Sequence, residues 1–371
     1  MQIQRFEIHH VAMPLIEPWR TAYGEDTTIE SILVKAVSDD HVAWSESAPH
    51  AAPCYSPEWA GAVFQCIKQW LAPALVGVDL STHEDVTQRM SPFKGNLFAK
   101  AALDNVWWSL KARMDGVPLH RALGATRDVV DVGADFGVMT DFDALLSAIG
   151  GAVEDGFARV KLKFRPGWDV AMLEAVRGAF PDLTVHIDCN SAYRLKDKAM
   201  FRAIDRFNLA MIEQPLAYDD LNDHAVLAHA IDTPICLDES ITSLDRARQA
   251  IEVGSCRWIN IKPGRVGGLS QAREIHDLCR EAGVGCWVGG MLESAVGTSL
   301  LIALATLDGF NYPPDIFPTD RFYTEDLADP PIRLCQRDGK ACVVAADVPG
   351  IGPAPVTERL DRWSVAQAVV G

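Results

Sequence analysis

Five ionisable side chains follow five apolar runs along the middle of the chain, at an almost constant spacing. They are Lys163, Asp188, Glu213, Asp238 and Lys262, each 24 or 25 residues after the one before. A period of this size is the length of one strand–helix unit. A chain that places a charged residue at the end of each buried run is therefore expected to repeat a single β–α unit.

The stretches between these runs have apolar residues at helical intervals. Residues 167–180, 243–254 and 267–283 are predicted helices, and the last ends at a glycine, a common C-terminal stop. Strands joined by helices are parallel, because parallel strands need crossover connections. Further apolar runs at 129–137, 285–290 and 309–313 bring the count to eight units. We therefore predict an α/β fold with a closed (β/α)₈ (TIM-like) barrel.

Catalytic groups of such barrels lie at the carboxyl ends of the strands, where these five side chains should meet. Asp188, Glu213 and Asp238 would stand on adjacent strands and repel one another unless a cation lay between them. Oxygen ligands of this kind suit Mg²⁺, with Mn²⁺ as the alternative. The competing interpretation is that each carboxylate caps the next helix or forms a loop salt bridge.

The lysines suggest proton transfer. Lys161 and Lys163 alternate along one strand, so both point to the same face. We expect two neighbouring cations in a partly buried mouth to lower each other's pKa, and a lysine with a pKa near neutral can act as a general base. Lys262 would lie across the barrel, so that one amine faces each side of a metal-bound substrate. The alternative is that Lys161 and Lys163 are the solvated end of an edge strand.

Several motifs carry a resemblance to a known family. The segments "KLK", "HIDCN", "IEQP", "LDES" and "NIKPGRVGG" resemble the enolase superfamily, in its muconate-lactonizing subgroup. The longer segments "KLKFRPGWDV" and "GGMLES" resemble the o-succinylbenzoate synthase / N-succinylamino acid (N-acylamino acid) racemase family. The resemblance implies that Asp188, Glu213 and Asp238 bind Mg²⁺ and that Asn190 supports that site. It also implies that Lys163 and Lys262 are the acid/base pair and that Lys161 is a supporting charge.

The implied chemistry is removal of the proton α to a carboxylate, through an enediolate whose charge the metal and Lys161 would stabilise. An isomerase that racemises N-acyl amino acids and a lyase that dehydrates the precursor of o-succinylbenzoate would use the same groups. A muconate-type cycloisomerase or a dipeptide epimerase remains an alternative, as does, more remotely, a barrel that only binds a ligand. The resemblance also implies a homo-oligomer.

The predicted domains are an α+β capping domain over 1–125, completed by the tail 319–371, and the barrel over 126–318. Loops 16–26 and 50–56 are expected to close the barrel mouth, and Trp19 and Tyr23 would contact substrate or simply pack. Gly290 and Met291, in "GGMLES", are expected at the same pocket.

Two positions depart from the family pattern. Asp135 ends the first strand, where a small neutral residue is usual, and a carboxylate there would disfavour an anionic substrate tail unless it is paired. Thr298 and Leu301 stand where an Arg and an Asn are common, and Thr298 resembles the muconate cycloisomerases instead.

Composition narrows the partners. The net charge of −16 argues against nucleic acid and against anionic membranes. No apolar run is long enough to cross a bilayer, and the first residues have no secretory pattern. The nine cysteines contain no C-x-x-C, so we expect reduced thiols in a cytoplasmic protein that acts on a small carboxylate.

Overall fold

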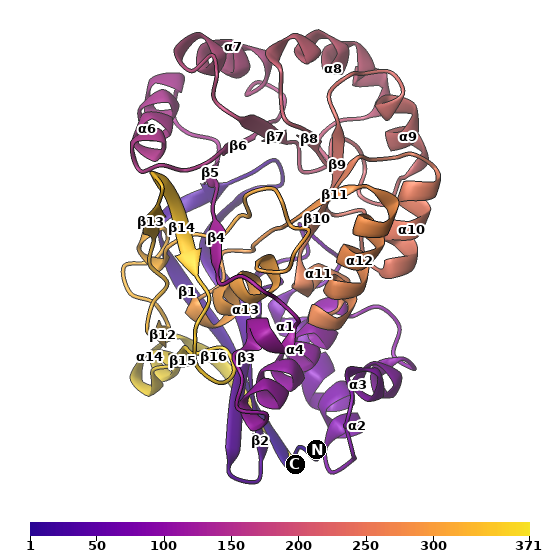
Figure 1. Ribbon diagram of the computed structural model, residues 1–371, viewed down its shortest axis with the longest axis vertical. Coiled ribbons are helices and arrows are strands. Elements are labelled where there is room, and N and C mark those ends of the chain that lie inside the picture. The colour runs from indigo at the N-terminus through magenta and orange to yellow at the C-terminus, as the bar shows by residue number, and fades with distance from the viewer.

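The computed structural model describes residues 1–371 and has two layers of organisation, an antiparallel sheet with helices and a parallel barrel (Figure 1). The antiparallel sheet has the order β16-β1-β2-β3. Its strands are β1 (Arg5–Arg20), β2 (Glu25–Ser38), β3 (His41–Ser47) and β16 (Ser364–Val370). Because β16 pairs with β1, the end of the chain completes the sheet that its beginning starts, and both termini lie at the same end of the molecule (Figure 1).

Helices cover one face of this sheet. The longest, α4 (Leu97–Met114), lies on β3, where Ser45 and Ser47 donate hydrogen bonds to its carbonyl groups at 2.6 and 2.9 Å. The other helical segments of this part are α1 (Ala60–Cys66), the π-helical turn Ile67–Leu71, α2 (Ala72–Leu75), α3 (His83–Met90) and α5 (Leu119–Ala122). The result is the predicted α+β cap.

Seven parallel strands form the curled barrel sheet, in sequence order from β5 to β11. They are β5 (Ala134–Phe136), β6 (Val160–Lys163), β7 (Val185–Asp188), β8 (Ile212–Glu213), β9 (Ile235–Leu237), β10 (Trp258–Ile261) and β11 (Gly285–Val288). Figure 1 shows the helices on their outer side: α6 (Phe142–Glu154), α7 (Val170–Ala179), α8 (Lys198–Ile204), α9 (Asn222–Ala228), α10 (Leu244–Glu252), α12 (Leu269–Ala282) and α13 (Ala295–Ala305). The predicted α/β barrel is confirmed.

The eighth stave is irregular, which corrects the prediction of a strand at 309–313. Phe310 makes one parallel bridge to Cys286. Further along, Asp315 N–H donates to Val288 at 3.0 Å, and the carbonyl of Pro314 accepts from Gly133 at 3.1 Å. The segment therefore closes the barrel between β11 and β5. It cannot form a regular strand, because two consecutive prolines lack N–H donors.

The first predicted strand, 129–137, is also split. Only β5 belongs to the barrel, whereas β4 (Val129–Asp131) pairs with β14 (Lys340–Val344), which pairs in turn with β13 (Cys335–Arg337). Cys335 and Cys342 lie opposite each other on β13 and β14 and are joined as a disulfide. The expectation that all nine cysteines are free thiols is therefore wrong for this pair, while the other seven are free.

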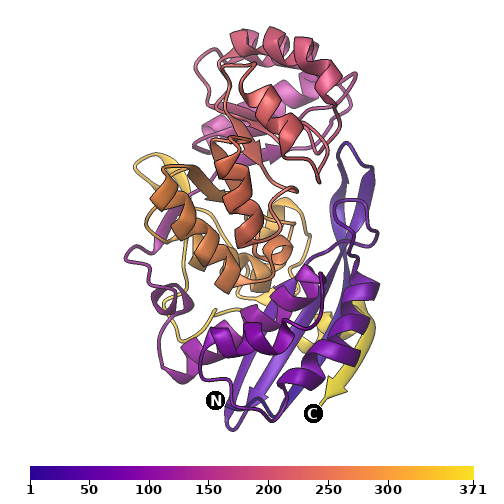
Figure 2. The same cartoon turned by 90° about the vertical axis from the view of Figure 1, so that its right-hand side faces the viewer.

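The cap reaches over the barrel mouth through the far end of the β1–β2 hairpin, which rises beside the barrel in Figure 2. The carbonyl of Arg20 accepts from Val138 N–H at 3.1 Å, and Arg165 donates to the Thr21 carbonyl at 3.1 Å. The hairpin end is thus fixed to the barrel by backbone groups.

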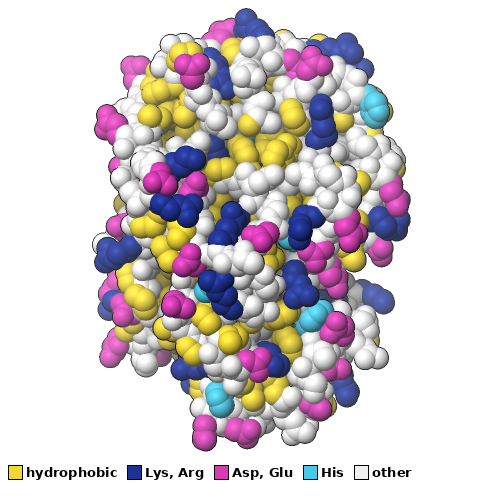
Figure 3. All heavy atoms as spheres, in the orientation of Figure 1, with side chains coloured by type: hydrophobic (Ala, Val, Ile, Leu, Met, Phe, Trp, Pro, Cys, Tyr) yellow, Lys and Arg dark blue, Asp and Glu magenta, His cyan; other side chains and the backbone are white.

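No helix is long and apolar enough to cross a membrane. Figure 3 shows acidic and basic side chains interspersed over one face, with no continuous basic surface for a nucleic acid backbone.

Candidate active site

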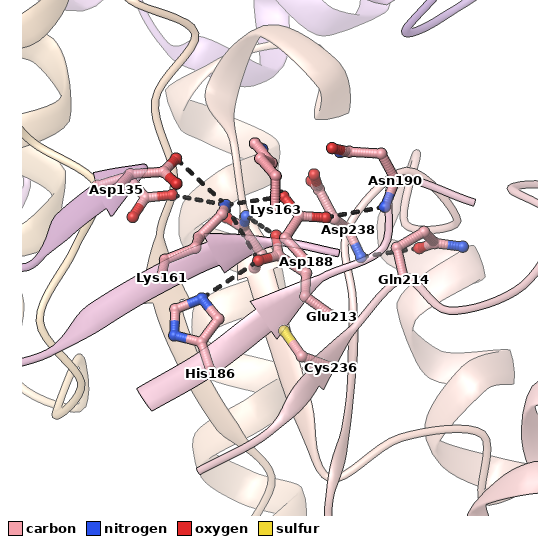
Figure 4. Close-up of polar contacts among 12 residues, drawn as sticks. Asp135, Lys161, Lys163, His186, Asp188, Asn190, Glu213, Gln214, Cys236 and Asp238 are labelled. Atoms are coloured by element: carbon pink, nitrogen blue, oxygen red, sulfur yellow. Dashed lines mark hydrogen bonds and ion pairs between the residues drawn. The ribbon is translucent and has the colours of Figure 1, made fainter. Parts of the chain in front are cut away.

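The register of the parallel strands brings the strand-end side chains together. Lys163 pairs with Asp188 across β6 and β7, and Asp188 pairs with Glu213 across β7 and β8. Asp238 follows β9 directly. All four are buried, and Figure 4 shows their side chains gathered at the same end of the strands. The constant spacing in the sequence therefore corresponds to one cluster in space.

Glu213 is fully buried and has three polar neighbours. Asn260 donates to its Oε1 at 2.7 Å, the Lys161 amine lies 3.1 Å from Oε2, and His186 Nε2 lies 3.4 Å from the same oxygen. His186 Nδ1 also meets the Tyr312 hydroxyl at 2.9 Å, so its ring is held within the core. These groups neutralise Glu213 in this structure.

Lys161 lies at the centre of the acidic groups. Its amine is 2.8 Å from Asp315, 3.1 Å from Asp188, 3.1 Å from Glu213 and 3.9 Å from Asp135. Burial lowers the pKa of Lys161, but the negative charges around it outweigh burial and hold the pKa well above its ordinary value. Lys161 is therefore a fixed positive charge at the barrel mouth.

The other two lysines also pair with carboxylates. Lys163 lies 2.7 Å from Asp188, and Lys262 lies 3.0 Å from Asp238, which also contacts Arg265. Burial lowers the pKa of both lysines because it disfavours the charged amine. The adjacent carboxylates have the larger effect and raise the pKa of both lysines. The prediction that the lysine pair lowers the pKa of Lys163 is wrong in this arrangement, because it counted the neighbouring amine and not the carboxylates.

A small cavity of about 30 Å³ lies between these lysines and the cap. Among its lining residues are all three lysines, Asn190 and every residue predicted for the substrate pocket: Trp19, Tyr23, Asp135, Gly290 and Met291. The cap also supplies His50 and Tyr55, and the barrel supplies Leu292, Asp315 and Phe317. This volume holds about one or two water molecules, so the cavity in this structure is smaller than a small carboxylate substrate.

The oxygen atoms fit a divalent cation. No group of three or more acidic, histidine or cysteine side chains is arranged as a formed metal site, since lysine amines lie against the three carboxylates. However, Asn190 Oδ1 is a buried acceptor without a hydrogen-bond donor, and Glu213 Oε2 has only its contacts to Lys161 and His186. Buried acceptors of this kind are rare and are usually satisfied by water or an ion. With Asp188 and Asp238 they form an oxygen-only donor set, which suits Mg²⁺.

Comparisons with known proteins agree with this geometry. Residues 4–124 match the model of the mandelate racemase / muconate lactonizing enzyme N-terminal domain, and residues 144–358 match the enolase C-terminal domain-like model. The chain belongs to the enolase superfamily.

Two of the similar proteins have different assigned activities. An o-succinylbenzoate synthase from Geobacillus kaustophilus is 41% identical over 98% of this chain and 96% of its own length. An N-succinylamino acid racemase from Amycolatopsis is 38% identical over the full length of both chains. A crystal structure of an enolase superfamily member from Listeria innocua, 33% identical, covers 100% of this chain and 99% of its own with a TM-score of 0.94. Full-length similarity to both types supports the family and leaves the reaction open.

Some residues of this enolase-superfamily site have no simple signal in the sequence. Asp315 comes from the irregular eighth stave and has no place in the 25-residue period. Tyr55 belongs to the cap, and its hydroxyl donates to Asp238 at 3.1 Å while its ring lies 4.6 Å from the Lys262 amine. Only the prediction that loop 50–56 closes the barrel mouth pointed to Tyr55. The contacts that Tyr55 makes with Asp238 and Lys262 depend on how the cap docks on the barrel.

Proposed function

We propose that the protein moves the proton α to a carboxylate, and that its reaction is the racemisation of N-acyl amino acids. The observation that carries this proposal is the placement of two amines around one cavity. Lys163 ends β6 and Lys262 follows β10, with β7, β8 and β9 between them, so the amines approach the cavity from opposite sides of the barrel. A two-base racemase needs one proton carrier on each face of the α-carbon.

The residues that would hold Mg²⁺, or Mn²⁺ in its place, are Asp188, Glu213 and Asp238, with Asn190 in support. Enolase superfamily sites combine a Lys or His base with bound Mg²⁺. When bound, the ion would supply positive charge to the substrate carboxylate and make its α-proton more acidic.

Lys163 and Lys262 would have complementary roles as proton acceptor and proton donor. In one direction neutral Lys163 would take the α-proton while charged Lys262 delivers a proton to the other face, and in the reverse direction the roles exchange. The carboxylates that most raise the pKa of the two lysines are Asp188 and Asp238, so a cation bound to them would oppose that rise. Lys161, whose amine lies within 3.1 Å of both Asp188 and Glu213, would be a positive charge beside the substrate carboxylate, where negative charge develops. Trp19, Tyr23, Gly290 and Met291 would shape the space for the substrate side chain.

Dehydration to o-succinylbenzoate is the second candidate, favoured by the 41% identity to the Geobacillus synthase. There, one lysine would remove the proton and the other would offer only its charge as water leaves. The muconate alternative has less support. Thr298 does not line the cavity, and its hydroxyl donates to the Glu293 carbonyl at 3.2 Å, so it is a helix residue and not a substrate contact.

The test is a side-by-side assay in D₂O with Mg²⁺. The substrates are a panel of N-acyl amino acids, the hydrated precursor of o-succinylbenzoate, and cis,cis-muconate. We expect α-proton exchange and racemisation with N-acyl amino acids, and loss of racemisation in Lys163→Ala. Turnover of muconate alone, or no exchange with any carboxylate, would reject the proposal.

A further inference from the structure

Two polar side chains of the cavity have no part in the proposed proton transfer. Asp135 is the middle residue of β5, level with Lys161 on β6, and is only 5% exposed, yet its Oδ1 has no hydrogen-bond partner. Its nearest cation is Lys161, at 3.9 Å, and that amine is already closer to three other carboxylates. A buried carboxylate oxygen without a donor costs about 1–3 kcal/mol or more, so its retention calls for an explanation.

His50 is the second such group and comes from the cap. It is 6% exposed, has a φ of +70°, and its Nδ1 is buried without a partner. The loop backbone is fixed, since its carbonyl accepts from Ala60 N–H at 2.9 Å and its ring packs edge-on against Tyr55. Positive φ is uncommon for residues other than glycine and often marks functional sites. Burial, with the charges of Lys262 and Lys163, lowers the pKa of His50 to about 4, so the ring is neutral at pH 7.

All the cations that line the cavity belong to the proposed proton-transfer site. The positively charged residues in its lining are Lys161, Lys163 and Lys262, and each has a carboxylate within 3.1 Å. A carboxylate at the far end of a substrate would therefore find no counter-ion and would face Asp135. A group that donates hydrogen bonds would instead satisfy the Asp135 oxygen, and it would satisfy His50 in the tautomer whose Nδ1 carries no proton.

We infer that Asp135 and His50 form a recognition point for the end of the acyl group, and that this end carries an N–H donor, such as a terminal amide or ammonium, instead of a carboxylate. This inference rests on the proposed function for the orientation of the substrate, with its α-carboxylate at the metal ligands. It narrows the substrate class to N-acyl amino acids with a non-anionic acyl group.

The test compares two ligands of equal shape, N-succinyl-L-phenylalanine and N-succinamoyl-L-phenylalanine, which differ only in a terminal carboxylate or primary amide. Affinity is measured by calorimetry on the full-length Mg²⁺-loaded protein, and kcat/KM by α-proton exchange.

We expect the amide to be favoured by about tenfold or more, because an uncompensated like charge in a buried site is strongly disfavoured. Asp135→Asn should bring the ratio close to one by improving the succinyl ligand, and His50→Phe should weaken the amide ligand. Asp40→Asn, in an exposed turn, makes the same change in net charge and should leave the ratio unchanged.

The outcomes separate the two proposals. Equal or tighter binding of the succinyl ligand, or no binding of either, overturns the inference. A ratio that Asp135→Asn does not change also overturns it, because the preference then arises elsewhere. Asp135-dependent preference for the amide without any α-proton exchange supports the recognition point and rejects the proposed reaction.

Discussion

Replacing Lys161 by methionine should destabilise the protein strongly, because three buried carboxylates share this one amine. Removing one partner of a buried ion pair costs about 3–5 kcal/mol. The energetic costs of losing these three contacts do not add in full, because each carboxylate has another partner. Asp315 still pairs with Arg159 at 2.5 Å, Asp188 with Lys163 at 2.7 Å, and Glu213 accepts from Asn260 at 2.7 Å. We therefore expect Lys161→Met, which preserves much of the side-chain volume, to lower the free energy of unfolding by about 3–5 kcal/mol at pH 7.

The pH dependence has a definite sign. Burial raises the pKa of Asp188, but Lys161 and Lys163 outweigh it and hold the pKa below its ordinary value. A carboxylate whose folded pKa is depressed contributes stability above its unfolded pKa of about 3.9 and loses it as pH falls. Lys161→Met should move the pKa of Asp188 in the folded protein back up. The difference in the free energy of unfolding between the parent and the variant should therefore be complete at pH 7 and narrow below about pH 4.

The assay is urea unfolding followed by tryptophan fluorescence at pH 7 and between pH 3 and 5. The control is Lys35→Met, because Lys35 pairs with Glu7 at 3.0 Å where both side chains are about a quarter exposed. That pair should contribute less than about 1 kcal/mol. A loss of under about 1 kcal/mol for Lys161→Met, or a loss that stays constant down to pH 3, would refute the reasoning.

Two further predictions concern the metal ligands and their support. Glu213→Gln removes a proposed ligand, so the rise in thermal midpoint that Mg²⁺ gives the parent should fall by more than half, and an unchanged rise would exclude Glu213 as a ligand. Gly289→Ala places a Cβ 2.2 Å from the Asn260 side chain, whose amide donates to Glu213. It should cost about 2–4 kcal/mol in urea unfolding and weaken Mg²⁺ binding. Gly178→Ala, on the exposed face of α7 with nothing within 4 Å, should be neutral or stabilising, and equal effects of both changes would contradict the packing argument.

The sequence predicts the middle of the barrel well because each stave there ends its buried run in one charged residue. Asp188, Glu213 and Asp238 meet in space because parallel strands in register place equivalent positions side by side. The eighth stave lacks that pattern. Pro313 and Pro314 prevent a ladder, so neither its irregular path nor the position of Asp315 follows from periodicity.

The direction of the lysine pKa shifts could not be predicted from the sequence. From the sequence, Lys161 and Lys163 are two like charges on one strand, which suggests a lowered pKa. In space, Lys161 lies among carboxylates from four other staves, and their attraction exceeds the repulsion between the amines. The position of His50 in the cavity could not be predicted from the sequence either, because it depends on how a cap loop docks on the barrel.

The most direct test of the account follows the two faces of the α-carbon separately. Lys163→Ala and Lys262→Ala are each incubated with the L- and the D-enantiomer of one N-acyl amino acid in D₂O with Mg²⁺, and loss of the α-proton is followed by NMR. We expect each variant to lose racemisation by about 10²–10⁴-fold. We also expect each to retain exchange with only one enantiomer, the opposite one in each case. Exchange of both enantiomers in either variant, or the same enantiomer in both, would contradict two lysines acting from opposite sides of one cavity.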